Sequence, residues 1–385
     1  MDATGIICEY NPLHLGHQKQ LDLIKAKYPD GGIVCLMSGN YVQRGHPAII
    51  DKGVRAQAAV LCGADLVLEL PLTASLSSAE GFAQEGVRIL GKLCSRLCFG
   101  AETADTHTLF STAQALLHPD FSDALHAQTE KGLSFPAARQ AALLSMGAPA
   151  STLTNPNDIL ATEYCKAILR QGLDMEPMVI AREGSYHDKE ADIENPSATS
   201  LRSRMLSRSS WLDYVPEEAA NVLNSAPLHT LSAGEQAILY RLRTMTDEEF
   251  AALPYGSEGL WRKLMHNTRT LATLEEIIAA TKSKRYTRTR LDRMVMCAFL
   301  GLTEEHFFHP APYARVLAFN DTGRTLLNKA REQGVFPNAG EAIDHSYQQL
   351  EYRAGALYSF FANGRIEPPQ SEASRRIFYQ KSTGK

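Results

Sequence analysis

The chain has 385 residues, 44% of them hydrophobic, and a formal net charge of −4, so it is long enough for two or three domains and too apolar for wholesale disorder. It contains no run of 18 apolar residues and no signal peptide, which predicts a cytoplasmic protein without a membrane partner. The seven cysteines form no Cys-x-x-Cys pair and no Cys/His cluster, so we expect reduced thiols and no protein-bound metal.

Short β-rich runs alternate with helical segments over the first two hundred residues. Strands are predicted at 4–8, 32–37, 65–70, 95–100 and 178–181, helices at 14–28, 52–62 and 77–90, and a mostly helical stretch at 106–170. Repeated strand–helix alternation means βαβ units with right-handed crossovers. The sequence therefore predicts an α/β fold with a doubly wound, Rossmann-like parallel sheet.

The pattern changes after about residue 205. Helical patterns dominate 216–300, and a short strand–turn–helix pattern follows at 314–330. We therefore expect two domains, a catalytic domain at 1–208 and a mostly helical domain at 209–385, with a boundary uncertain by about ten residues.

The strongest motif lies where the first strand ends. Pro12 turns the chain off the strand, and His14 and His17 are then spaced i, i+3, so that they share one face of the first helical turn. A helix N-terminus favours an anion, and Gly16 leaves room for a nucleotide to approach the backbone. The motif predicts a triphosphate site in which both imidazoles stabilise charge on the α-phosphate. The alternative is a pair of core or metal-binding histidines.

A second phosphate motif is predicted near the end of the sheet, at 197–202. Thr199 and Ser200 supply hydroxyl groups at a helix start, and Arg202 can neutralise phosphate charge. An ordinary Ser/Thr helix cap is the alternative. Both motifs are similar to those of the nucleotidyltransferase superfamily, which includes class I aminoacyl-tRNA synthetases.

The resemblance extends to a narrower family. Matching motifs occur at 9–12, 37–45 with Pro47, 63–71, 99–102, 156–160, 182 with 186–188, and 284–287, with single matches at Lys52 and Arg55. Together they resemble the bacterial tRNA(Met) cytidine acetate ligases over most of the chain. Leu13 stands where we expect an aromatic residue, and Ala161 where we expect glycine; both affect packing more than chemistry.

The resemblance implies an ATP site with His14 and His17 as catalytic residues. The residues expected to bind ATP are Ile7, Cys8, Glu9, Tyr10, Asn11, Pro12, Leu13, His14, Leu15, Gly16, His17, Gly100, Asn157, Arg182, Thr199, Ser200 and Arg202. A side chain at position 100 would block an adenine or ribose, Asn157 can bond a base edge or ribose, and Arg182 follows a strand near the phosphates. The alternatives are a strand-ending turn for Gly100, a helix cap for Asn157 and a surface cation for Arg182.

Four further polar residues follow the second strand or lie on the next helix. Gln43, Arg44, Lys52 and Arg55 are weaker candidates for facing the substrate carboxylate or the phosphates. A polar loop and helix face explain them nearly as well.

The densest basic run is 282–293. Lys284, Arg285 and Arg288 are the expected tRNA-binding residues, and Tyr286 is suited to stacking on a base. A solvated, charged helix face is the alternative. The same run leads into a helix whose apolar stripe is formed by Leu291, Met294, Val295, Ala298 and Phe299.

These observations predict an ATP-dependent ligase. The resemblance implies that acetate is activated to acetyl-adenylate and passed to N4 of the wobble cytidine of elongator tRNA(Met), forming N4-acetylcytidine. Mg²⁺ is expected as a phosphate counter-ion, and the oligomeric state is left open. A small-molecule adenylyltransferase of cofactor biosynthesis and a non-catalytic RNA-binding protein are the alternatives; the first needs no basic second domain, and the second needs no intact phosphate motifs.

Overall fold

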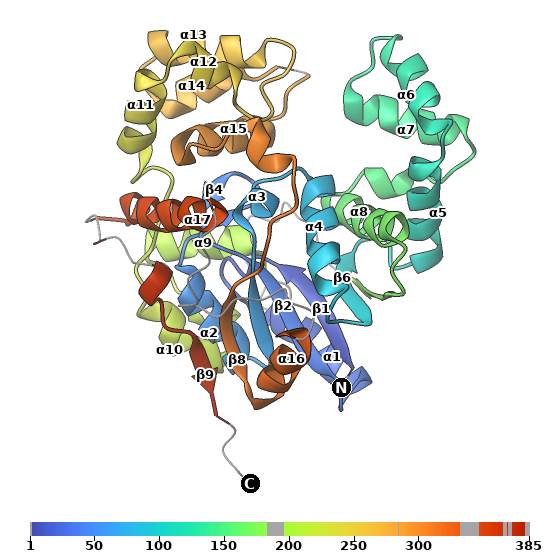
Figure 1. Cartoon of the computed structure of the whole chain (residues 1–385), viewed down its shortest axis with the longest axis vertical. Coiled ribbons are helices and arrows are strands. Elements are labelled where there is room, and N and C mark those ends of the chain that lie inside the picture. The colour runs from blue at the N-terminus through green and yellow to red at the C-terminus, as the bar shows by residue number, and fades with distance from the viewer. Residues whose placement is uncertain are drawn as a thin grey trace.

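The computed structural model describes residues 2–182, 196–283, 285–331, 346–364, 368 and 372–381 (Figure 1). Its centre is a seven-stranded sheet in the order β7-β6-β1-β2-β5-β8-β9. The strands are β1 (Ala3–Cys8), β2 (Gly32–Ser38), β5 (Leu66–Leu70), β6 (Arg96–Ala101), β7 (Glu176–Ala181), β8 (Val316–Asn320) and β9 (Phe378–Gln380). A separate antiparallel hairpin consists of β3 (Tyr41–Val42) and β4 (His46–Pro47).

The strands β7, β6, β1, β2 and β5 are parallel neighbours. Side chains along β2 alternate between the two faces: Val34 and Leu36 join one apolar core, and Ile33, Cys35 and Met37 join the other. Helices α4 (Ala79–Leu90), α5 (Thr106–Leu117), α8 (Pro156–Gln171) and α16 (Asp321–Arg331) pack on the first face. Helices α1 (Leu15–Lys27), α2 (Lys52–Leu61) and α10 (Glu217–Asn224) pack on the second. The doubly wound α/β fold predicted from the sequence is confirmed.

The second half of the chain returns to this sheet. Strand β8 pairs antiparallel with β5, and β9 pairs parallel with β8. The side chain of Asn320 donates to Asp65 Oδ1 at 2.9 Å, which fixes β8 beside the start of β5. The sheet therefore contains strands from before and after residue 208, where we expected the domain boundary. Strand β8 covers the edge of β5, which would otherwise be unpaired.

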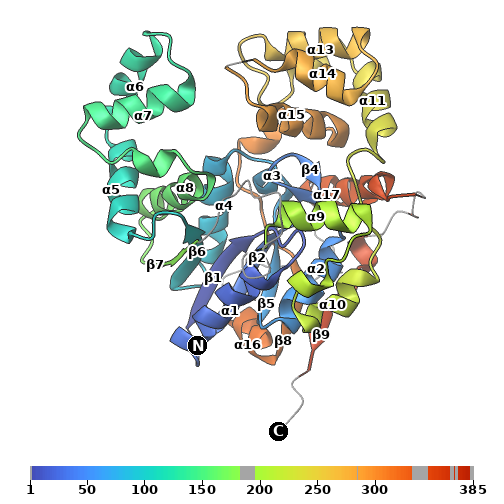
Figure 2. The same ribbon diagram turned by 180° about the vertical axis from the view of Figure 1, so that it is seen from behind.

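Two helical lobes stand above the carboxyl ends of the parallel strands (Figures 1 and 2). One contains α6 (Phe121–Thr129) and α7 (Phe135–Ser145), and extends from α5. The other has its own apolar core, and its helices are α11 (Glu235–Thr244), α12 (Asp247–Ala251), α13 (Leu260–Thr270), α14 (Leu274–Thr281) and α15 (Arg288–Leu300). The predicted stripe of α15 is buried in that core. None of the helices described here is long and apolar enough to cross a membrane.

Three further helices connect these parts. They are α3 (Leu72–Ser75), α9 (Ala198–Ser207) and α17 (Ser346–Leu357). Helix α17 packs against α15 and reaches the hairpin, where Tyr41 donates to the carbonyl of Ala354 at 2.9 Å. The hairpin therefore lies between the sheet and the second lobe.

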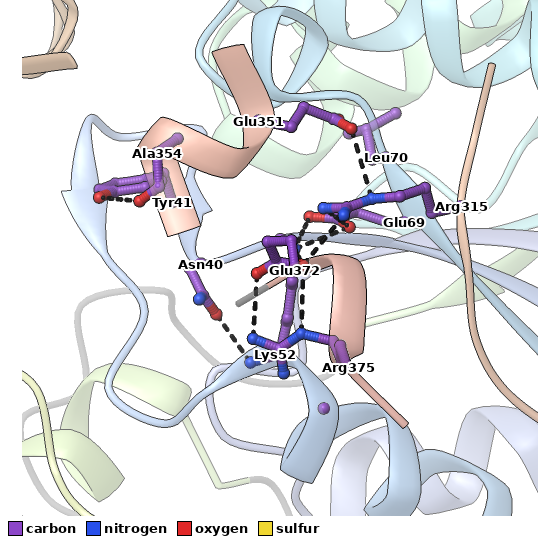
Figure 3. A network of polar contacts seen from close by, with 12 residues as sticks. Asn40, Tyr41, Lys52, Glu69, Leu70, Arg315, Glu351, Ala354, Glu372 and Arg375 are labelled. Carbon is purple, nitrogen blue, oxygen red and sulfur yellow. Dashed lines mark hydrogen bonds and ion pairs between the residues drawn. The ribbon is translucent and has the colours of Figure 1, made fainter. Parts of the chain in front are cut away.

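A buried ionic network joins distant parts of the chain beside the ends of β2 and β5 (Figure 3). Lys52 Nζ lies 2.7 Å from Glu69 Oε1 and 3.0 Å from Glu372 Oε2. Arg315 contacts the same two carboxylates at 2.9 and 3.0 Å, and its Nε lies 3.3 Å from Glu351 Oε2. Because each carboxylate has a cationic neighbour, the network ties α2, β5, β8, α17 and the C-terminal segment together at a buried position.

Candidate nucleotide-binding active site

The two histidines of the N-terminal motif lie side by side at the start of α1. The His14 and His17 rings are stacked, with centroids 3.7 Å apart and planes inclined by 25°. The turn off β1 places Tyr10 in the left-handed region (φ 43°) and includes a cis Asn11–Pro12 peptide bond. The buried Tyr10 ring meets His17 edge-on at 4.9 Å, so it supports the second imidazole from behind.

Both imidazoles are held neutral. Burial, with the nearby guanidinium groups of Arg182 and Arg202, lowers the pKa of His14 to about 3. Burial and the His14 ring lower the pKa of His17 well below its usual range. His14 Nδ1 is buried and has no hydrogen-bond partner within the described part of the chain. A neutral imidazole nitrogen of this kind is available to an incoming ligand.

The second phosphate motif meets the first directly. Ser197 caps α9 by accepting from the Ser200 amide at 3.1 Å. Arg202 donates to the backbone carbonyl of Asn11 at 2.8 Å and to Thr199 Oγ1 at 3.0 Å. A helix N-terminus, a hydroxyl group and a guanidinium therefore converge on the start of α1, which is an arrangement suited to a polyphosphate.

Residues from β6, β7 and α8 form the opposite wall. Arg182 donates to Asn157 Oδ1 at 3.2 Å, and Asn157 donates to Glu102 Oε1 at 2.6 Å. A Cβ atom at Gly100 would lie 3.0 Å from Arg182 Cγ. In this structure the glycine makes room for the Arg182 side chain, a contact that the sequence does not reveal.

These walls enclose a cavity of about 420 Å³. The expected ATP-binding residues that line it are Glu9, Asn11, His14, Gly16, His17, Gly100, Asn157, Arg182, Thr199 and Arg202. The expected residues that do not line it are Ile7, Cys8, Tyr10, Pro12, Leu13, Leu15 and Ser200. Ser200 turns its hydroxyl back to the Ser197 carbonyl at 2.9 Å, so it belongs to the helix cap.

The cavity has further lining residues that were not among the expected ATP-binding residues. They come from α1 (Lys19, Gln20), the hairpin region (Val42, His46, Pro47, Ile49), β7 and α9 (Ile180, Ala181, Pro196, Ser197, Ala198, Leu206) and the second half (His229, Thr230, Leu231). The family-like motif at 37–45 with Pro47 could have identified the hairpin residues as part of the site. No local pattern marks the segment at 229–231, because only the fold brings it here.

Of the four weaker candidates, only Arg44 lines the cavity. Lys52 is buried against Glu69 and Glu372, and the Arg55 guanidinium donates to backbone carbonyls, including Ile50 at 2.8 Å. Gln43 donates its side chain to the Ser77 carbonyl at 3.1 Å. The expectation that Lys52 and Arg55 face a substrate was wrong, because both satisfy buried polar groups of the scaffold.

The basic segment lies on the second lobe. Arg285 is paired with Glu258 at 2.6 Å, and Arg288 with Glu275 at 2.6 Å and Asp292 at 3.0 Å. Both side chains are exposed, so these pairs compete weakly with an incoming phosphate. Lys284 and the motif at 186–188 lie outside the described residues.

A family model described as HIGH Nucleotidyl Transferase matches residues 1–373. The tRNA(Met) cytidine acetate ligase of Clostridium acetobutylicum is 33% identical over 98% of this chain and 99% of that protein. The chain belongs to the tRNA(Met) cytidine acetate ligase family. The resemblance drawn from its motifs is confirmed.

Other members of this ligase family agree. The tRNA(Met) cytidine acetate ligase of Clostridium novyi is 35% identical over 88% of this chain and 89% of that protein. A crystal structure of Thermotoga maritima TmcAL in its apo form superposes with a TM-score of 0.90 at 26% identity, covering 99% of this chain and all of the other. A second crystal structure of that protein, with alpha-thio ATP bound, gives a TM-score of 0.87 at 27% identity with the same coverage.

Proposed function

We propose that this chain is an ATP-dependent acetate–tRNA ligase. It activates acetate to acetyl-adenylate and transfers the acetyl group to N4 of the wobble cytidine of elongator tRNA(Met), forming N4-acetylcytidine. The observation that carries the proposal is the junction of two phosphate motifs at one cavity, where Arg202 donates to the Asn11 carbonyl beside the stacked His14 and His17. The family of the chain and the ATP analogue bound to a homologous fold support it.

In the first half-reaction an acetate oxygen attacks the α-phosphate and pyrophosphate leaves. His14 and His17 are neutral donors placed for charge that develops on the α-phosphate oxygens. Arg202 and Thr199 hold the β- and γ-phosphates at the start of α9. Asn157 binds the nucleoside side of ATP from the opposite wall, and Arg182, which lies beside the histidines, binds its phosphates.

Mg²⁺ belongs to this proposal as a counter-ion of the phosphates. Glu9 is the one carboxylate in the lining of the described cavity, and its Oε1 already accepts from the Gln43 amide at 2.9 Å. That donor set fits an ion held mainly by phosphate oxygens. The ion would supply charge neutralisation of the triphosphate.

In the second half-reaction the cytidine amine attacks the acetyl carbon, AMP leaves and N4 loses a proton. The mixed anhydride is already activated, so no covalent acyl-enzyme is required. All seven cysteines are free and buried, which leaves no exposed thiol to accept the acetyl group. Reduced, buried thiols also support the expected cytoplasmic location.

ATP–pyrophosphate exchange with and without acetate tests the proposal. Exchange that requires acetate, followed by acetylation of tRNA(Met), is the expected result. Exchange that requires a phosphorylated cofactor precursor would assign the chain as a small-molecule adenylyltransferase. RNA binding without any exchange would make it a non-catalytic binding protein.

A further inference from the structure

A second, larger pocket lies between the sheet domain and the second lobe. It has a volume of about 680 Å³, and it is lined at one end by Ser77 and Ser78 and at the other by aromatic and guanidinium groups. The aromatic residues are Tyr255, Trp261, Phe307 and Phe308. The Phe308 side chain is unusually open for its size, with 64% of its surface exposed. Flat, accessible rings of this kind are suited to stacking on a nucleobase.

Two arginines of α15 line this pocket, and neither forms an ion pair with a carboxylate of the described residues. Arg293 is only 8% exposed, its Nε has no hydrogen-bond partner, and none of the described carboxylates forms an ion pair with it. Arg290 donates to the Tyr255 carbonyl at 2.7 Å and to Ser257 Oγ at 2.9 Å, which are neutral acceptors. The Glu304 carboxylate lies at the exposed rim of the pocket. A buried cation without a counter-ion is unfavourable, so the pocket is electrostatically prepared for an anion.

The contrast within the same basic segment is informative. Arg285 and Arg288 are each paired with glutamates on the surface, whereas Asp292 turns away from the pocket toward Arg288. Burial lowers the pKa of Arg293, and Arg290 is among its charged neighbours. Arg290 and Arg293 are therefore the cations of this helix whose charge the protein leaves unbalanced.

Helix α4 adds a second feature that favours an anion. Its N-cap Ser78 lines the pocket and accepts from the Gly81 amide at 3.3 Å, so the positive end of this twelve-residue helix is directed toward the space. Phosphate-binding and base-stacking groups are thus present in a single pocket.

One residue links this pocket to the catalytic cavity. The Gln43 carbonyl accepts from Arg293 Nη1 at 3.4 Å, and its side chain donates to the Ser77 carbonyl at 3.1 Å, both on the side of the second pocket. Its amide donates to Glu9, which lines the catalytic cavity, as do the adjacent Val42 and Arg44. Gln43, in the turn between β3 and β4, therefore contacts lining residues of both pockets.

We propose that this second pocket holds a nucleotide of the RNA substrate next to the cytidine that enters the catalytic cavity. Arg293 and Arg290 take its phosphate, and the rings of Trp261 and Phe308 stack on its base. This inference rests on the proposed function, because it assumes that the cytidine enters beside the hairpin. The residues that contact RNA in this proposal belong to the second pocket, and they are different from the ion-paired Arg285 and Arg288.

The direct test uses the fluorescence of Trp261. The chain has two tryptophans, so Trp211→Phe leaves Trp261 as the only one. Addition of tRNA(Met) is expected to quench its emission in a saturable way, since a base stacked on an indole ring changes its environment. RNA that binds with unchanged emission would overturn the proposal.

Two variants test the energetics. Phe308→Ala should weaken tRNA binding by about tenfold, since base–aromatic stacking contributes on that scale. Arg293→Gln should weaken binding and flatten its salt dependence by about one unit of log–log slope, while its melting temperature stays at or above that of the wild type. Tyr240→Ala is the matched control, because Tyr240 is 72% exposed on the same lobe and lies outside this pocket.

The outcomes separate this proposal from the assigned reaction. Unchanged tRNA affinity and an unchanged salt slope in both pocket variants would overturn the proposal that the second pocket binds RNA, even if the wild-type enzyme acetylates tRNA. If tRNA quenches Trp261 in the Trp211→Phe variant but the wild type shows no acetate-dependent exchange, the RNA pocket would be retained and the ligase rejected. Because Phe308 is exposed, its replacement tests the idea even if Arg293→Gln fails to fold.

Discussion

At the scale of single residues, the site depends on imidazoles that carry no charge. Stacked rings 3.7 Å apart would repel each other if both were protonated, and Arg182 lowers the pKa of both rings while Arg202 lowers that of His14. Each neutral ring keeps one N–H group, so His14 and His17 can each donate a hydrogen bond to a phosphate oxygen. The positive charge in the cavity comes from Lys19, Arg44, Arg182 and Arg202.

The first prediction concerns these two histidines. His14→Ala or His17→Ala should lower acetate-dependent ATP–pyrophosphate exchange by about two to three orders of magnitude, because each removes a donor aimed at the reacting phosphate. His266→Ala is the control, since His266 is exposed on α13. Circular dichroism should show an intact fold in all three variants. Wild-type exchange in either cavity variant would remove that histidine from the reaction.

The second prediction concerns the opposite wall. Arg182→Gln should raise the Kd for ATP by about tenfold or more, because a charge-assisted contact is lost. The pKa of His14 should rise in the same variant, since Arg182 is one of the groups that lowers it. Calorimetric titration and histidine NMR measure the two effects.

Asn157→Ala should weaken ATP binding in the same assay, because its amide both accepts from Arg182 and lines the cavity. Arg170→Gln is the control for α8, where Arg170 pairs with Glu80 on the surface. Unchanged ATP affinity in Arg182→Gln and Asn157→Ala would show that neither residue binds ATP and that both have a structural role.

At the scale of elements, the hairpin of β3 and β4 joins the two halves of the chain. Gly45 adopts φ 80° and packs directly on α15, where a Cβ atom would lie 2.4 Å from the Arg293 amide. His46, on the same hairpin, lies 3.5 Å from Asp292. The helix that carries the basic segment is therefore in contact with a wall of the catalytic cavity.

The third prediction separates the two half-reactions. Replacing Lys284, Arg285 and Arg288 by Glu should weaken tRNA binding, with the log–log salt slope falling by about one unit for each lost phosphate contact. Acetylation of tRNA should fall much further than acetate-dependent exchange measured without tRNA, because exchange uses only the ATP cavity. The pairs with Glu258 and Glu275 are exposed and contribute about 0–1 kcal/mol each. Because Arg288 also pairs with the buried Asp292, thermal unfolding of the triple variant is measured beside the two assays.

A matched control is available on the same lobe. Arg269 is an exposed arginine paired with Asp247 at 2.6 Å, and Arg269→Glu should leave tRNA binding close to wild type. Equal losses in both half-reactions of the triple variant would indicate a folding defect. No loss in either would show that the segment is a solvated surface.

At the scale of the whole molecule, the ionic network of Figure 3 holds the C-terminal segment against the sheet. The pKa values of Glu372 and Glu351 are shifted in opposite directions. Lys52 and the neighbouring arginines outweigh burial and lower the pKa of Glu372 to about 2, whereas burial raises the pKa of Glu351 to about 7. The two carboxylates therefore make stability depend on pH in different windows.

The fourth prediction follows from the signs of these shifts. The raised pKa of Glu351 means that the folded state binds a proton more tightly than the unfolded state, so stability falls as pH rises from about 4.5 to about 7. Glu351→Gln should remove that fall and be more stable than wild type at pH 8, by roughly 1–3 kcal/mol. Arg315 keeps Glu69 and Glu372 as partners in the variant.

Urea unfolding at pH 5 and pH 8 measures this effect. The lowered pKa of Glu372 acts in the other window, where stability is lost as pH falls from about 4.5 toward 2, and Glu351→Gln should leave that loss in place. A variant that is less stable than wild type at pH 8 would contradict the assignment of Glu351.

The sequence by itself determined the features that depend on neighbouring residues. The apolar run of β2, the spacing of His14 and His17 and the helix start at 197–202 are local, so they could be predicted with their order in the chain. The α/β fold and the family, which were predicted from such local features, are confirmed by the sheet and by the similar proteins. The ATP-site and tRNA-binding assignments stay predictions, although ten of the expected ATP residues share one cavity.

The tertiary structure decided which distant residues meet. Strand β8 was visible as a strand–turn–helix pattern, but its pairing with β5 depends on an edge that lies 250 residues away in the chain. Lys52 carries a charge that suits a phosphate as well as a carboxylate, and only the approach of Glu69 and Glu372 made it part of the scaffold. In α15, likewise, Glu275 and Asp292 neutralise Arg288, whereas the buried Arg293 has no counter-ion among the described residues. Charge and residue type are local properties, whereas burial and partner choice are set by contacts that no short stretch of sequence contains.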